Sequence, residues 1–294
     1  MSDLFLEIPT QPDLSSHIAC GSDELISSFY EPLKRAYPSY ISRTSIGTDT
    51  SGEYQMFLYD FCPDQYDACV FLQSGVHPIE TEGYLGLARI MEMIANNEFP
   101  DLRARVRFLV IPIVSVYGVS QKARADSIIK RYDIPHNALG INSNRDCYEC
   151  RLNETKNVLG VVEKYMDIID CGFDLHTTTT EEWGDYLTVY PDSLPHRKEV
   201  VALNNMLRSR NIKGRQERIV YCGSSSEYPT GSNASSYASY ITEEMGIPMC
   251  TLEHSDLVFD SALGTSAALT RAVELYLNHI MLALDFYKKR KYGL

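Results

Sequence analysis

Long apolar segments are missing from this chain. None of its 294 residues belongs to an unbroken apolar run of the roughly 18 residues that a membrane-spanning helix needs. The segment from Met1 to Glu7 lacks the basic stretch and the apolar core that together mark a secretory signal. We therefore expect a soluble, cytoplasmic protein.

Positive charge is also scarce. The chain has 27 Lys and Arg against 39 Asp and Glu, a formal net charge of −12. Such a surface repels phosphate backbones and anionic lipid, so neither nucleic acid nor a membrane is expected as a partner. The basic run from Lys288 to Lys291 closes a helical pattern, where cations offset the negative end of the helix dipole.

Cysteines are too few and too irregularly spaced for a disulfide scaffold. We expect most of the eight to be reduced and buried. Cys147 and Cys150 form an isolated CxxC, which we interpret as packing or incidental thiols because no second pair accompanies it. Repeats and linkers rich in Pro, Gly or Ser are absent too. Residues 1–294 are therefore predicted to be one domain, with residues 1–39 as an N-terminal extension and helix packed on it.

Strand-like and helical patterns alternate along the chain, which predicts a mixed, largely parallel sheet covered by helices on both faces. A long loop is expected over Tyr117–Arg151. The predicted strands are Tyr54–Phe61, Cys69–Leu72, Arg105–Val114, Phe173–Leu175, Tyr186–Tyr190, Arg218–Cys222 and Met249–Leu252. The predicted helices are Asp23–Tyr37, Ile79–Ala95, Glu154–Ile169, His196–Arg208, Ala234–Met245 and Ser266–Lys289.

Two candidate metal ligands follow the strand-like run Ala68–Gln73. His77 and Glu80 stand three residues apart, where a strand end hands the chain to a helix start. His176 ends another apolar strand and is the natural third ligand. Two imidazoles and a carboxylate hold catalytic zinc and leave a position open. An alternative for His176 is a histidine that only caps the sheet edge.

Two further groups complete a hydrolytic site. Glu253 ends the strand-like run Ile247–Leu252, so it points toward the same sheet edge and can act as a general base. A solvated loop glutamate is the alternative interpretation. Asn144 and Arg145 lie in the long central loop, where a guanidinium can bind a carboxylate through two hydrogen bonds.

Taken in order, these motifs resemble the signature of the zinc carboxypeptidase family, the carboxypeptidase A-like metallopeptidases. The resemblance runs from about residue 40 to the C-terminus. It implies a three-layer α/β/α fold, a mixed, mostly parallel sheet of about eight strands and one catalytic Zn²⁺ per chain. The motifs are Gly75-x-His77-x-x-Glu80, Asn144-Arg145, Asp174-Leu175-His176 and Thr251-x-Glu253-x-x-Asp256.

The resemblance also implies roles. His77, Glu80 and His176 match the metal ligands. Asn144 and Arg145 match the residues that bind the substrate's terminal carboxylate, and Glu253 matches the general base. The family's mobile tyrosine corresponds best to Tyr228, with Tyr237 as second choice. Its carbonyl-polarising arginine is expected before Asn144. We assign that role to Arg124, with Lys122 and Arg131 left open.

Two departures leave the substrate open. Ile79 stands where many family members have arginine, and Asn142 replaces the usual aspartate. We expect a zinc-dependent hydrolase that cleaves an amide bond next to a free carboxylate, with a peptide as substrate of a metallocarboxypeptidase. One alternative is a deacylase of small N-acyl amino acids, resembling aspartoacylase and succinylglutamate desuccinylase. Another is a non-catalytic binding module on the same fold.

Overall fold

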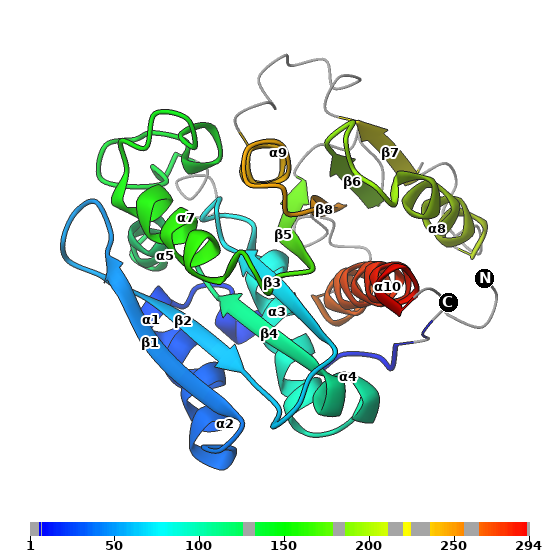
Figure 1. Ribbon diagram of the computed structural model, residues 1–294. Coiled ribbons are helices and arrows are strands. Elements are labelled where there is room, and N and C mark those ends of the chain that lie inside the picture. The colour runs from blue at the N-terminus through cyan, green and yellow to red at the C-terminus, as the bar shows by residue number, and fades with distance from the viewer. Residues whose placement is uncertain are drawn as a thin grey trace.

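A single mixed sheet organises the chain. The computed structural model describes residue 6 and residues 8–125, 133–178, 186–210, 220–224, 236–255 and 265–292. Within these ranges eight strands pair in the order β1-β2-β4-β3-β5-β8-β6-β7. Four of the seven strand pairings are parallel, and helices cover both faces (Figure 1). The predicted three-layer α/β/α fold with about eight strands is confirmed.

Parallel strands form the centre of the sheet. Strand β3 (Ala68–Ser74) pairs with β4 (Val106–Ile111) on one side and β5 (Cys171–Thr178) on the other, and β5 pairs with β8 (Met249–Ser255). The sequences of β3 and β4 are nearly continuous apolar runs, and almost all of their residues are buried. This composition is typical of strands that have helices on both faces.

Each edge of the sheet joins this centre through an antiparallel pairing. Strands β1 (Ile41–Thr48) and β2 (Gln55–Phe61) form a hairpin that adds to β4. At the other edge β6 (Tyr186–Tyr190) runs antiparallel to β8 and parallel to β7 (Val220–Ser224). Strand β1 was not predicted because its sequence, ISRTSIGT, places a buried side chain only at Ile41. Pairing with β2, rather than its own hydrophobic pattern, makes it a strand.

Helices fill the two outer layers. Helix α3 (Thr81–Ala95) is buried almost throughout and packs with α10 (Thr265–Tyr292) on one face of the sheet. Helices α7 (Asn153–Tyr165) and α9 (Tyr237–Glu243) lie on the opposite face (Figure 1). The other helical segments are η1 (Ser15–His17), α1 (Ser22–Leu25), η2 (Ile26–Tyr30), α2 (Glu31–Ala36), α4 (Pro100–Arg105), α5 (Val116–Ala123), η3 (Ser143–Arg145) and α8 (Arg197–Arg210).

The predicted loop over Tyr117–Arg151 is wrong at its start, because α5 occupies Val116–Ala123. The sequence VYGVSQKA contains a glycine and two valines, all poor helix formers, so tertiary packing forms this helix. None of the described helices is long and apolar enough to cross a lipid bilayer.

Candidate metal centre

The turn between β3 and α3 carries the first two candidate ligands. Gly75 follows β3 with a φ of 63°, and a Cβ there would come within 3.2 Å of the backbone of Ile113. Glycine therefore suits this turn, which directs the chain away from the sheet. The turn places His77 Nδ1 2.5 Å from Glu80 Oε1 just before α3 begins.

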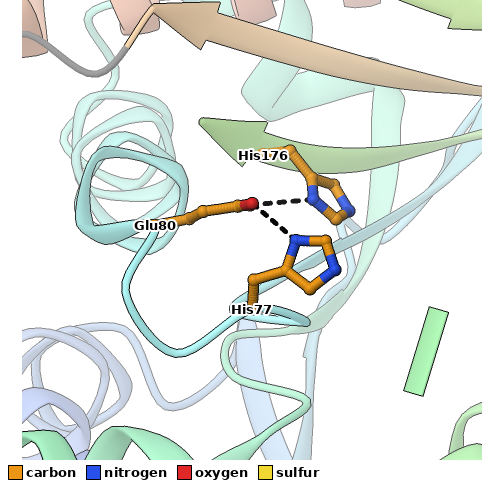
Figure 2. A group of neighbouring side chains, drawn as sticks. All are labelled: His77, Glu80 and His176. Atoms are coloured by element: carbon orange, nitrogen blue, oxygen red, sulfur yellow. Dashed lines mark hydrogen bonds and ion pairs between the residues drawn. The ribbon is translucent and has the colours of Figure 1, made fainter. Parts of the chain in front are cut away.

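Strand β5 supplies the third candidate ligand. His176 Nδ1 lies 2.8 Å from Glu80 Oε2, and the backbone N–H of Thr177 donates to the same oxygen at 3.1 Å. Both imidazoles point toward the Glu80 carboxylate (Figure 2). One ligand atom from each of His77, Glu80 and His176 lies within 4.8 Å of the other two. Glu80 and His176, which are 96 positions apart in the sequence, thus meet beyond the carboxyl end of the central strand β3.

The donor atoms of this cluster fit a divalent metal ion. Two imidazole nitrogens and one carboxylate oxygen are the ligand set of many catalytic zinc sites. His176 is 1% exposed, and His77 Nε2 is buried without a hydrogen-bond partner among the described residues. The chemistry and the spacing of the three side chains therefore match a cation.

Charges in the cluster shift its pKa values strongly. Burial alone raises the pKa of Glu80, but the charges and hydrogen bonds of His77 and His176 outweigh it and hold that pKa well below the usual range. Burial lowers the pKa of His176, whereas Asp174 and Glu80 raise it well above normal. Two carboxylates thus concentrate negative potential on His176, which favours a positive charge there.

Asp174 orients His176 through the imidazole nitrogen that faces away from Glu80. Its Oδ2 lies 2.8 Å from His176 Nε2, and Asp174 is fully buried. A carboxylate that faces one imidazole nitrogen leaves the other nitrogen directed at the metal. From the sequence, Asp174 was assigned no role beyond its place in the motif Asp174-Leu175-His176. The i, i+2 spacing on a strand was the signal for this role, since such residues leave the same face.

Strand register brings Glu253 beside the cluster. Glu253 is the β8 partner of His176 in the parallel β5–β8 ladder, so the two side chains leave the same face of the sheet. Burial raises the pKa of Glu253 to about 7, against the opposing effect of the His176 charge. A carboxyl group with this pKa can accept and return a proton near neutral pH.

The short helix η3 presents Asn144 and Arg145. Asn144 Oδ1 accepts a hydrogen bond of 3.0 Å from the backbone N–H of Tyr237. This bond fixes the orientation of the side-chain amide, whose nitrogen is a hydrogen-bond donor. Arg145 Nη1 donates to the carbonyl of Asn144 at 2.6 Å. The buried carboxylate of Asp146 holds the chain behind them by accepting hydrogen bonds from the N–H groups of Arg151 and Leu152.

The remaining predicted groups are not joined to the cluster by any contact within the described residues. Arg124 is exposed at the end of α5 and donates to the Tyr54 hydroxyl at 3.4 Å, and no contact joins it to the metal cluster within the described ranges. Its assignment stays a prediction. Tyr228 and Arg131 lie outside the described residues. Lys122 is buried, and its ammonium donates to Thr81 Oγ1 at 3.1 Å.

Tyr237 is not a mobile tyrosine. Its side chain is fully buried, and its hydroxyl donates to Thr155 Oγ1 at 3.4 Å inside the core. This second choice was wrong because Tyr237 starts α9, whose buried face packs on the sheet. The two thiols of the CxxC motif are both free. Cys147 is buried and Cys150 Sγ donates to the carbonyl of Cys147 at 3.1 Å.

A scan against models of protein families found no match for this sequence, and a search of curated proteins found no similar chain. Solved structures do match. The metallo-carboxypeptidase from Burkholderia cenocepacia is 19% identical with a TM-score of 0.66, and the match covers 90% of this chain and 70% of that chain.

Two further matches are structures of complexes. Bovine thrombin-activatable fibrinolysis inhibitor in complex with tick carboxypeptidase inhibitor is 15% identical with a TM-score of 0.70, and the match covers 93% of this chain and 99% of that one. The metallo-carboxypeptidase from Pseudomonas aeruginosa in complex with (2-guanidinoethylmercapto)succinic acid is 18% identical with a TM-score of 0.61, over 88% of this chain and 68% of that one.

These likenesses show the fold of this chain. It is the fold of the metallocarboxypeptidases, and the resemblance inferred from the sequence motifs is confirmed at that level. At identities below 20% the fold does not by itself carry an activity, so function has to be argued from the site.

Proposed function

We propose that this chain is a zinc-dependent hydrolase that cleaves an amide bond next to a free carboxylate, as a metallocarboxypeptidase does. One observation carries the proposal. On a metallocarboxypeptidase fold, His77, Glu80 and His176 converge to within 4.8 Å, and Glu253 stands in register beside them. A matching fold and a matching donor set together support hydrolysis more strongly than either alone.

His77, Glu80 and His176 are the residues that would hold one Zn²⁺ per chain. When bound, the ion supplies a Lewis acid that acidifies water and polarises a carbonyl group. Other divalent ions accept the same ligands, so zinc is proposed from the two imidazoles and the carboxylate, which it commonly binds. Asp174 would keep His176 in the tautomer whose Nδ1 is free to bind the ion.

The chain's own side chains supply binding and proton transfer. Arg145 and the amide of Asn144 bind the substrate carboxylate, which fixes the position of the neighbouring amide bond. Glu253 accepts a proton from the attacking water and delivers it to the leaving amine. A bound cation lowers the pKa of Glu253 below the value that burial alone produces, so the carboxylate is the base at neutral pH.

The proposed substrates are peptides with a free C-terminal carboxylate. Two of the similar structures support this choice, since one is in complex with a carboxypeptidase inhibitor and another with a substituted succinic acid. Small N-acyl amino acids carry the same carboxylate beside an amide and remain the alternative. The cytoplasmic location expected from the sequence is part of the proposal.

Metal content and cleavage test this function together. Purified wild type is expected to bind about one zinc per chain and His176→Ala much less, because two side chains hold a catalytic ion poorly. His17→Ala is the matched control, since His17 packs on Phe29 in the N-terminal helical segment.

Zinc-loaded wild type is then offered free-acid peptides, the same peptides with amidated C-termini, and N-acyl amino acids. If free-acid peptides are the only substrates cleaved, the proposal is supported. If N-acyl amino acids are the only substrates cleaved, the deacylase alternative is supported. A wild-type protein that binds no zinc when zinc is supplied contradicts both.

A further inference from the structure

A third histidine lies against the proposed metal ligands. The ring centroid of His136 is 4.9 Å from that of His77, with the two planes tilted by 51°. His136 is partly exposed, yet its Nδ1 atom is buried and has no hydrogen-bond partner among the described residues. A buried polar atom without a partner beside a reactive centre points to a ligand that completes it.

Packing holds the backbone of His136 in place. Helix α5 approaches so closely that a Cβ on Gly118 would lie 2.8 Å from the carbonyl oxygen of Pro135, 2.9 Å from that of His136 and 2.2 Å from Cγ of Pro78. Because Pro78 adjoins His77, the close approach at Gly118 holds the loop that carries His77 and the loop that carries His136 against the same helix, α5.

Asn137, the residue after His136, anchors the part of the loop that follows it. Asn137 is fully buried, and its Oδ1 accepts hydrogen bonds from the N–H groups of Leu139 and Ile141 at 3.1 and 3.2 Å. Its Nδ2 donates to the carbonyl of Ile141 at 2.6 Å. The turn formed in this way leads directly into Asn144 and Arg145. His136 therefore stands in the chain just before a fixed turn, with its ring against that of His77.

We propose that His136 is a further catalytic residue, whose imidazole N–H donates a hydrogen bond to the oxyanion that develops on the scissile carbonyl. This inference rests on the proposed function. The substrate carbonyl must lie beside the metal ligands, and the ring of His136 packs against that of the ligand His77 with its buried Nδ1 unpartnered among the described residues. A fixed imidazole donor stabilises such charge without reorganising during the reaction.

His136 thereby takes the role that the family resemblance assigns to an arginine in this loop. Arg124, chosen from the sequence, instead contacts Tyr54 at the exposed end of α5. A role for His136 as a fourth metal ligand fits less well, because both ligand imidazoles face the Glu80 carboxylate and His136 is not among the residues whose donor atoms converge there.

The test compares His136→Ala and His136→Gln with wild type, all loaded with zinc. Three quantities are measured: kcat/KM for a free-acid peptide, the dissociation constant of a phosphonate analogue of that peptide, and the dissociation constant of a substituted succinate. The phosphonate carries charge where the oxyanion forms and the succinate does not. Zinc affinity is measured by competition with a chromophoric chelator. His17→Gln controls for the substitution itself.

His136→Ala is expected to lose about 10²–10³-fold in kcat/KM and a similar factor in phosphonate affinity. Succinate and zinc affinity stay at wild-type values. His136→Gln recovers part of the loss because its amide N–H can replace the donor. If Arg124→Ala shows this loss of kcat/KM and phosphonate affinity and His136→Ala does not, the inference is overturned.

Three other outcomes also decide the matter. Weaker zinc binding by both His136 variants overturns the inference in favour of a ligand or structural role. Wild-type protein that binds zinc but neither cleaves any of the amides nor binds the phosphonate overturns the proposed function, and the inference with it. Phosphonate binding that is equally tight in wild type and His136→Ala overturns the inference alone.

Discussion

Asp174 and His176 show how a single strand can position a metal ligand. The two residues leave the same face of β5, and the Asp174 carboxylate lies 2.8 Å from His176 Nε2. Both side chains are almost completely buried, so neither has solvent as an alternative partner. The imidazole is therefore held in one orientation before any ion arrives, which reduces the cost of forming the site.

Replacement of Asp174 by Asn tests this orientation. Asp174→Asn is expected to weaken zinc binding by about 10–100-fold, because an amide accepts a hydrogen bond from Nε2–H less strongly and can select the wrong tautomer. Competition with a chromophoric chelator measures the affinity, and Asp64→Asn in an exposed loop is the control. Equal zinc affinity in Asp174→Asn and wild type would mean that Asp174 only fills the core.

Glu253 is tested by removing its charge. Glu253→Gln is expected to lower kcat by about 10²–10⁴-fold while zinc stays bound, since the amide cannot accept a proton. In wild type the carboxylate is the active form, so kcat/KM falls as the pH drops through the pKa of Glu253, and Glu253→Gln lacks this acidic limb. Steady-state kinetics between pH 5 and 8 measure both effects. Near-normal turnover by Glu253→Gln contradicts its assignment as the base.

At the scale of elements, helix α5 depends on close contact rather than on its own sequence. Gly118 in its middle disfavours a helix by about 1 kcal/mol relative to alanine. The glycine is nevertheless required, because Pro78 and the carbonyl oxygens of Pro135 and His136 occupy the space that a Cβ would fill. Helix α5 thus sets the distance between the loops that carry His77 and His136.

Gly118→Ala tests this contact, with Gly160→Ala as its matched control. Gly118→Ala is expected to destabilise the protein by about 1–3 kcal/mol, because the clash with backbone atoms outweighs the gain in helix propensity. A Cβ on Gly160 in α7 meets no atom within 4 Å, so Gly160→Ala should stabilise by roughly 0.4–1 kcal/mol. Urea unfolding measures both changes. Stabilisation by both variants would show that α5 has room to move.

At the scale of the whole molecule, a buried histidine on α10 links folding to pH. His279 Nε2 lies 3.3 Å from both Asn204 Oδ1 on α8 and Thr188 Oγ1 on β6. Burial lowers the pKa of His279 to about 3, so the folded protein keeps this side chain neutral. The unfolded chain binds the proton more readily, and the stability that depends on neutral His279 is lost as the pH falls below about 6.5.

His279→Gln isolates this effect from other titrating groups. Between pH 7 and pH 5 wild type is expected to lose about 2 kcal/mol relative to His279→Gln, because only wild type has to keep His279 unprotonated. Urea unfolding of both proteins at the two pH values gives the difference. A stability difference that stays constant with pH would mean that His279 takes up its proton in the folded state.

Much of the fold could be predicted because its signals are local. The apolar runs of β3 and β4 and the periodicity of α3, α7 and α10 follow from which residues are buried, and burial leaves a pattern in the sequence. Strand β1 and helix α5 left no such pattern, because β1 is held by its hairpin partner and α5 by contacts of Gly118.

The fold class and the candidate ligands His77, Glu80 and His176 could be predicted from the linear chain, since strand ends and donor spacing are visible in it. Three contacts needed the folded chain: the meeting of these side chains, the register of Glu253 with His176, and the packing of His136 rather than Arg124 against a ligand. These contacts join segments tens of residues apart. Strand pairing and helix packing create them, and no local pattern specifies either.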